Sequence, residues 1–193
     1  MPQSEGPMLL HHADCSMLLV DAQERLLPAL DGQQGMVAAC GLLLRAAREL
    51  EVPVLATVQY PKGLGGVVPD LAGLLPPDAV AEKICFDAMA EPGMAGRVAA
   101  LKRRRVVLCG AEAHVCVLQT AFGLQAAGYE VVVAADAVAS RDPEDRQRGL
   151  ARMERAGMLV ATSEMVVFEW LRRADTPAFK AMIPFIKRLK EKS

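Results

Sequence analysis

Three side chains that are able to take part in chemistry stand at or near the ends of short apolar runs. Asp21 directly follows one run, Lys83 lies near the end of a second, and Cys116 follows a third after a short turn. Asp21 is either a loop cap or a catalytic carboxylate. Lys83 is either an edge lysine that extends to solvent or a cation that needs a carboxylate partner or serves a site. Cys116 is either a small buried apolar residue or a reactive thiol.

The stretch 106–128 places Cys116 near the beginning of a helix. Its first four residues, VVLC, favour a buried strand, Gly110 interrupts that strand, and residues 116–128 favour a helix that ends near Gly128. Unpaired N–H groups and the positive end of the helix dipole favour a thiolate over a thiol at such a position. The same N–H groups are able to hold an oxyanion. This stretch alone leaves the buried-apolar alternative for Cys116 open.

Alternating apolar runs and helical patterns predict the elements that must position these side chains. Strands are predicted at 17–20, 52–58, 79–85, 106–109, 130–136 and 159–162, and helices at 33–50, 93–104, 116–128 and 143–157, with two more helices at the end of the chain. This order predicts an α/β fold: a three-layer αβα sandwich around a Rossmann-like, six-stranded, mostly parallel sheet. No repeat or linker divides the chain, so residues 1–193 are predicted to form one domain.

The predicted connections add two expectations about binding and assembly. The Gly- and Pro-rich segment 59–78 is predicted to be a long loop, which is either a binding wall or an irregular surface connection. It has no Gly-Lys-Ser/Thr ending, so it is not a phosphate loop. The helix at 116–128 is apolar nearly all round, and we expect a homo-oligomer because one sheet would not cover every apolar face.

Composition excludes several classes of partner. The chain has 22 basic and 23 acidic residues and 4% aromatic residues, so we expect no nucleic acid and no membrane as partner. The basic run 102–105 is predicted to lie solvated at the end of a helix. The first residues do not have the pattern of a signal peptide. Five scattered cysteines without metal-ligand spacing favour a reduced, cytoplasmic protein.

The sequence resembles the isochorismatase-like cysteine hydrolases, a family that includes nicotinamidases and N-carbamoylsarcosine amidase. Four motifs carry the resemblance: LLVDAQERL (18–26), EKICFDAM (82–89), GAEAHVCVLQTAFGLQAAGYEVVVAADAVASR (110–141) and TSEMVVFEW (162–170). They span most of the chain in the order and spacing of the family. The segment TVQYPKGLGGVVPDL (57–71) is most similar to the isochorismatase-domain-containing subgroup.

The resemblance implies a role for each of the three side chains. Cys116 matches the nucleophile, Asp21 the base that takes its proton, and Lys83 the cation that stabilises the anionic groups. A neighbouring base and cation and a helix N-terminus would favour a thiolate, so we expect Cys116 to react with iodoacetamide well below the pH that an ordinary thiol needs.

The family also implies a backbone feature. A non-proline cis peptide is expected between Ala111 and Glu112, and the N–H groups of Glu112 and Cys116 are expected to form an oxyanion hole. The predicted substrate pocket takes its walls from residues near the three strand ends: Gln23, Gln59, Tyr60, Phe86 and His114. His114 is a wall or surface residue in this prediction, since a neighbour two positions from Cys116 rarely points toward it in a turn.

Two departures from the family limit the function that we expect. Nicotinamidases carry Asp and His metal ligands after the second strand, and ATVQYPKGLG contains neither, so we expect no metal and no cofactor. The subgroup often has an acidic residue where Val58 stands, which makes transfer of a substrate unsafe. True isochorismatases lack the cysteine. The prediction is a cysteine hydrolase that acts on a C–N bond of a small molecule, and the alternative is an oligomeric binding or interaction protein.

Overall fold

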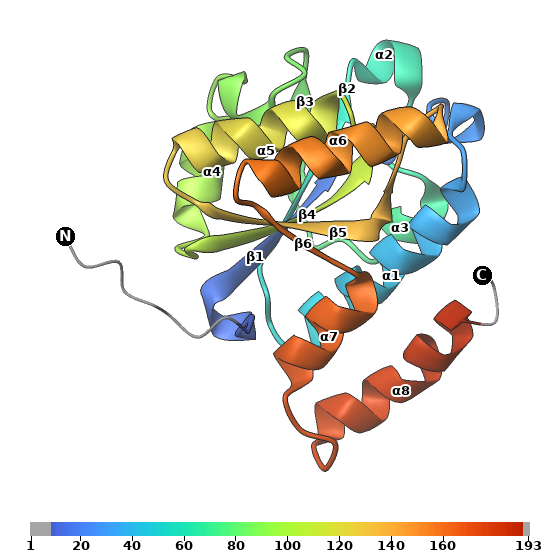
Figure 1. Ribbon diagram of the computed structural model, residues 1–193, viewed down its shortest axis with the longest axis vertical. Coiled ribbons are helices and arrows are strands. Elements are labelled where there is room, and N and C mark those ends of the chain that lie inside the picture. Colours follow the sequence, from blue (N-terminus) through green and yellow to red (C-terminus); the bar gives the residue numbers. More distant parts are fainter. Residues whose placement is uncertain (1–8, 191–193) are drawn as a thin grey trace.

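A six-stranded, fully parallel sheet forms the centre of the molecule (Figure 1). The structure is a computed structural model, and it describes residues 9–190. The strands are β1 (Cys15–Val20), β2 (Val54–Gln59), β3 (Val80–Lys83), β4 (Arg105–Ala111), β5 (Glu130–Ala139) and β6 (Leu159–Ala161). Their order in the sheet is β3-β2-β1-β4-β5-β6. The predicted fold class is therefore confirmed.

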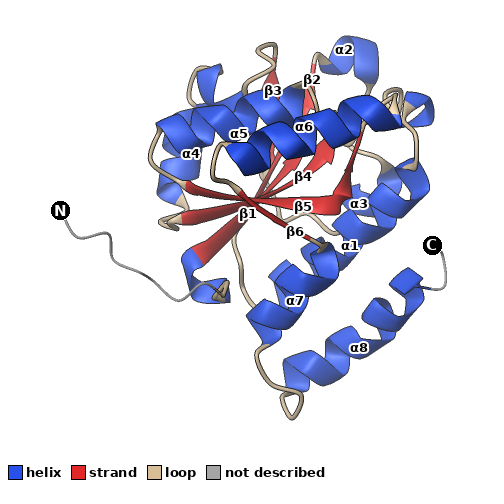
Figure 2. Ribbon diagram, viewed as in Figure 1, coloured by secondary structure: helices blue, strands red, loops and turns tan. Residues whose placement is uncertain are grey.

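Helices cover both faces of the sheet (Figure 2). They are α1 (Gln33–Glu49), α2 (Pro61–Leu64), α3 (Pro69–Ala72), α4 (Met94–Ala100), α5 (Cys116–Ala126), α6 (Pro143–Arg155), α7 (Ser163–Leu171) and α8 (Pro177–Lys190). One apolar core lies between the sheet and α1, α3, α7 and α8, and a second lies between the sheet and α4, α5 and α6. Side chains of a strand alternate between the two cores, so Met17 and Leu18 enter opposite ones.

The two central strands approach each other closely at their carboxyl ends. Val20 of β1 pairs with Gly110 of β4, and Gly110 has a φ of 117°. A Cβ atom at Gly110 would lie 1.9 Å from the carbonyl oxygen of Val20. Only glycine tolerates both this backbone angle and this contact. The sequence predicted that Gly110 interrupts the strand, whereas in the structure β4 continues through Gly110 to Ala111.

The structure shifts several predicted boundaries. Strand β3 ends at Lys83, so Cys85 lies outside the strand that the sequence predicted to contain it. The predicted loop 59–78 contains the short helices α2 and α3. Helix α4 ends at Ala100, before the basic run begins, and Arg105 of that run is buried against Glu130. These differences arise from tertiary contacts that override a local pattern.

The physical argument for a homo-oligomer does not hold in this fold. Helix α5 packs within its own chain against β4, β5, α6 and a 3₁₀ turn at Ala88–Ala90. Its apolar faces are therefore covered without a partner, although the oligomer itself remains a prediction. Among residues 9–190, no helix is both long enough and apolar enough to cross a membrane.

Candidate active site

The structure brings Asp21, Lys83 and Cys116 together at the carboxyl edge of the sheet. Lys83 Nζ lies 2.7 Å from Asp21 Oδ2, and both side chains are almost fully buried. Cys116 lies close enough to both for each to shift the pKa of its thiol, and the residue is 6% exposed. The residues come from three separate strand ends, as parallel strands allow.

The backbone after β1 aims the Asp21 carboxylate into this cluster. Asp21 has a left-handed φ of 48°, a conformation that costs about 1–3 kcal/mol for a residue with a side chain. Thr57 of the neighbouring β2 holds it at two points. The Thr57 hydroxyl donates to Asp21 Oδ1 at 2.7 Å, and the Thr57 carbonyl accepts from the Asp21 N–H at 3.1 Å.

Sequence reasoning did not single out Thr57. A signal was present, because Thr57 is the one hydroxyl in an otherwise apolar predicted strand. A buried hydroxyl needs a partner, and parallel pairing with the preceding strand places the Asp21 carboxylate next to it.

The Lys83 ammonium has a full set of acceptors. Besides the Asp21 carboxylate, it donates to Gln59 Oε1 at 2.7 Å and to the carbonyls of Cys85 at 3.2 Å and Phe86 at 3.5 Å. Gln59 in turn donates from Nε2 to the Ile84 carbonyl at 2.7 Å. These partners compensate the burial of the ammonium and hold it in place, so Lys83 is the paired cation of the two alternatives and not an edge lysine that extends to solvent.

The thiol at this site is not a preformed thiolate. Burial and the negative charge of Asp21 raise the pKa of Cys116 from 9.0 to about 12, and Lys83 lowers it only in part. The expectation of easy alkylation at low pH is therefore wrong for the free site. The physical reason is that a carboxylate close enough to take the proton also repels the thiolate.

The sequence prediction assigned an oxyanion hole to two backbone N–H groups, those of Glu112 and Cys116. The Ala111–Glu112 peptide bond is cis, where the family resemblance placed it. Among residues 9–190, neither the Glu112 N–H nor the Cys116 N–H donates to a protein acceptor, whereas those of Val115 and Val117 both donate to the Glu112 carbonyl. No side chain caps the start of α5. An oxyanion hole requires N–H groups without a protein acceptor, and the assignment of these two to one stays a prediction.

The predicted pocket residues take different places. The Gln23 amide is fully buried and bonds the backbone of Gln59 and of Gly65, so it supports the segment after β2. Tyr60 and Phe86 are each 53% exposed.

His114 and Gln59 are also held by other residues. His114 Nδ1 lies 2.8 Å from the Ser140 hydroxyl, and its Nε2 lies 3.6 Å from the Asp145 carboxylate. Gln59 fixes the Lys83 ammonium. Their contact with a substrate stays a prediction, and the geometry shows Gln23 and Gln59 acting on the protein itself.

The described part of the chain contains no group of three or more His, Cys, Asp or Glu side chains that could hold a metal ion. The carboxylates of Asp21 and Glu112 already have cationic partners. Asp21 pairs with Lys83, and Glu112 Oε1 accepts from Arg141 Nε at 2.7 Å.

Comparison with known proteins places this geometry in a family. Residues 15–165 match the isochorismatase domain. Isochorismatase domain-containing protein 2A of Mus musculus is 37% identical over 175 residues, which are 89% of this chain and 82% of that protein. MAR1 ribonuclease from Caenorhabditis elegans has 34% identity and a TM-score of 0.86, with 92% of each chain covered.

More distant structures share the fold. The YcaC protein of Escherichia coli, described as an octameric hydrolase of unknown specificity, has a TM-score of 0.86 at 23% identity. That match covers 97% of this chain and 96% of YcaC. The domain match covers most of the chain, and the mouse relative agrees with it over nearly the whole length. The chain therefore belongs to the isochorismatase family and has the fold of its hydrolases.

Proposed function

We propose that this protein is a cysteine-dependent hydrolase that cleaves a C–N, amide-type bond of a small molecule through a thioester. One observation carries the proposal: a thiol, a carboxylate and an ammonium from three strand ends meet in one buried cluster. Burying these charges is costly, so a sequence that keeps them at a strand edge beside a nucleophile favours a catalytic role.

The first half of the reaction uses the thiol and the carboxylate as a pair. Cys116 Sγ attacks the carbonyl carbon of the substrate while its proton passes to Asp21, so a thiolate forms only as the S–C bond does. The carbonyl oxygen becomes an oxyanion, which the N–H groups of Glu112 and Cys116 hold. When the C–N bond breaks, the protonated Asp21 gives its proton to the leaving amine.

Water completes the reaction. Asp21 takes a proton from a water molecule, the resulting hydroxide attacks the thioester carbonyl, and the C–S bond breaks to release a carboxylic acid. The sulfur recovers its proton from Asp21. Lys83 keeps its charge throughout and offsets the negative charge that Asp21 carries at the start and end of each half-reaction.

The alternative function is binding without turnover. A third possibility, cleavage of RNA, comes from the name of one relative. MAR1 ribonuclease has 34% identity to this chain. A polyanion needs basic surface, and here the net charge is −1. The basic run 102–105 leads into β4 at the sheet edge opposite Cys116, and both Arg104 and Arg105 pair with Glu130. These features favour a small substrate over RNA.

We also propose that the protein is a cytoplasmic homo-oligomer. All five cysteines are free, which suits a reducing compartment.

The E. coli YcaC structure is octameric by its description. Three large apolar side chains, Tyr60, Ile84 and Phe86, are 53%, 65% and 53% exposed around the end of the edge strand β3. Such a patch is typical of an interface, and light scattering that gave a monomer at micromolar concentration would contradict the assembly.

A screen of purified protein against a panel of small amides and carbamoyl compounds tests the function. Release of ammonia or amine is measured for the wild type and for Cys116→Ser, with a structured RNA included as one member of the panel. The proposal requires turnover of at least one amide-type compound by the wild type only. Turnover by Cys116→Ser at the wild-type rate, or cleavage of the RNA alone, would contradict it.

A further inference from the structure

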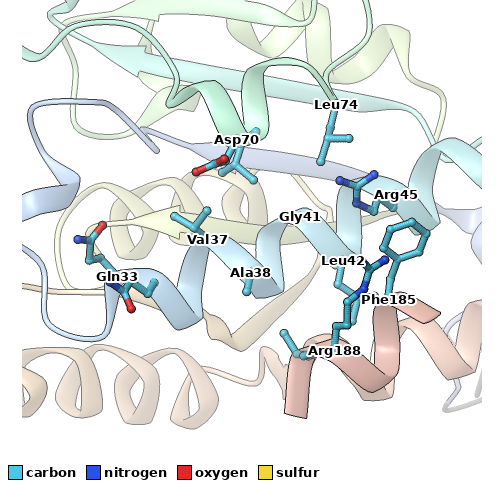
Figure 3. A pocket seen from close by; sticks show the side chains of 13 residues that line it. Gln33, Val37, Ala38, Gly41, Leu42, Arg45, Asp70, Leu74, Phe185 and Arg188 are labelled. Carbon is cyan, nitrogen blue, oxygen red and sulfur yellow. The ribbon is translucent and has the colours of Figure 1, made fainter. Parts of the chain in front are cut away.

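A groove lies on the side of the sheet that α1 covers, away from the core that contains Cys116. It has a volume of about 760 Å³ and runs between α1, α3 and α8 (Figure 3). Its apolar lining comes from all three helices: Val37, Ala38, Gly41, Leu42, Leu71, Leu74, Phe185 and Leu189. Helix α1 covers one face of the sheet, and Cys116 packs into the core on the other. The groove is thus a separate feature, within the size range of small-molecule sites.

One helix forms the length of the groove. Lining positions 34, 37, 38, 41, 42 and 45 of α1 recur at helical spacing, so they make one continuous stripe. The stripe is about 17 Å long at 1.5 Å per residue. The small residues Ala38 and Gly41 leave this stripe without long side chains at its middle, and a Cβ at Gly41 would lie 3.7 Å from Leu71 and 3.9 Å from Leu74 across the groove.

Two positive charges meet at one end of the groove, beside the ring of Phe185. The guanidinium carbon of Arg45 lies 4.6 Å from the ring centroid, and that of Arg188 lies 4.8 Å from it. Figure 3 shows both side chains beside Phe185 and Gln33 at the far end.

Within residues 9–190, no carboxylate offsets these charges. Among residues 9–190, neither arginine forms an ion pair, and Arg188 Nε donates to the Pro184 carbonyl at 3.1 Å. The Asp70 carboxylate lines another part of the groove, apart from the Phe185 end. Two like charges beside one ring repel each other, and an anion at this end of the groove would lower that repulsion and accept charge-assisted hydrogen bonds from guanidinium N–H groups.

We propose that the groove between α1, α3 and α8 binds an amphiphilic anion, with its apolar chain along α1 and its anionic head on Arg45 and Arg188. The apolar stripe selects an elongated hydrocarbon body, and the arginine pair selects a carboxylate or a similar anionic head. This site does not depend on the proposed hydrolase activity.

Calorimetric titration of the full chain with sodium decanoate tests the site, with 1-decanol as the matched neutral probe. The expected result is saturable binding of one decanoate per chain and weaker binding of decanol. Arg45→Gln and Arg188→Gln should each weaken decanoate binding about tenfold or more, the effect of losing a hydrogen bond to a charged group. Arg48→Gln, on the same helix but outside the lining, is the control and should bind as the wild type does.

A second variant tests the apolar part of the groove. Ala38→Phe places a ring in the groove from a half-buried position on α1 and should abolish decanoate binding while the circular dichroism spectrum stays unchanged. Three results would overturn the proposal: no saturable binding to the wild type, equal affinity for decanol and decanoate, or wild-type affinity in both arginine variants.

Discussion

Two buried thiols seven positions apart show what makes a cysteine a candidate nucleophile. Cys109 lies within β4 and Cys116 begins α5, and burial raises the pKa of both thiols. Cys109 has the Leu18 carbonyl at 3.9 Å and a second thiol, Cys40, as its polar neighbours, and the Asp136 carboxylate, which also raises its pKa, accepts from the N–H and the hydroxyl of Ser163. Cys116 has a carboxylate and an ammonium.

The comparison separates burial from reactivity. A thiol that is only buried is harder to ionise and has no group to take its proton, so it acts as an apolar residue. The Cys116 thiol is also hard to ionise at rest, but the Asp21 carboxylate lies beside it as a group that can accept the proton when a substrate arrives. The central claim is therefore that the carboxylate, rather than an intrinsically low pKa, activates Cys116.

Replacing the two cysteines in turn should have opposite consequences. Cys116→Ser should lower turnover roughly a thousandfold or more, because it removes the nucleophile and little volume. Cys109→Ala should leave turnover near the wild-type value and lower the free energy of unfolding by roughly 1–2 kcal/mol through a small core cavity. Steady-state kinetics and urea unfolding measure both. A large loss of turnover in Cys109→Ala with the fold intact would break the distinction.

Removing the carboxylate should separate thiol acidity from catalysis. Asp21 raises the pKa of Cys116, so Asp21→Asn should lower that pKa and speed alkylation by iodoacetamide at pH 8. The same change should slow turnover about 10²- to 10⁴-fold, because the base is lost. Glu24→Gln, at an exposed neighbour, is the control for both assays. Slower alkylation together with slower turnover would mean that Asp21 only supports the fold.

Removing the cation should have the reverse effect on the thiol. Lys83 lowers the pKa of Cys116, so Lys83→Met should raise it and slow alkylation at every pH below about 12. The variant also leaves Asp21 buried without its partner, which should cost about 3–5 kcal/mol of unfolding free energy. A double variant, Asp21→Asn with Lys83→Met, should recover part of that stability. If the double variant were no more stable than Lys83→Met, the ion pair would not be the cause.

The raised pKa of Cys116 should also appear in the stability of the free protein. The folded thiol holds its proton up to about pH 12, whereas an unfolded thiol releases it near 9.0. Stability from this group is complete below pH 9 and is lost as pH rises toward 12, by on the order of a few kcal/mol. Urea unfolding at pH 8 and pH 10.5 should show a steeper loss in the wild type than in Cys116→Ser. Equal slopes would contradict the raised pKa.

The smallest expected effect is that of chelation. Exhaustive treatment with a chelator should leave turnover unchanged, since ATVQYPKGLG (56–65) offers no Asp or His ligand. Restoration of lost activity by added zinc would make this prediction wrong.

The sequence allowed the sheet and the convergence of three strand ends to be predicted, because buried strands are continuous apolar runs and parallel strands share one carboxyl edge. It did not predict where β3 ends, since Val80 and Glu82 are exposed on an edge strand and keep no apolar pattern. The pKa of Cys116 was predicted in the wrong direction, because sequence spacing does not reveal how close Asp21 lies or how deeply the thiol is buried. The groove between α1, α3 and α8 depends on packing between distant segments, so no local pattern indicated it.

Trapping the covalent intermediate tests the central claim most directly. The protein is mixed with the best amide-type substrate from the panel, quenched in acid within one turnover, digested and analysed by mass spectrometry. An acyl group on the peptide that contains Cys116, which accumulates when Asp21→Asn slows hydrolysis of the thioester, is the predicted result. An acyl group on any other cysteine, or normal turnover with no acylated Cys116 at any time, would contradict it.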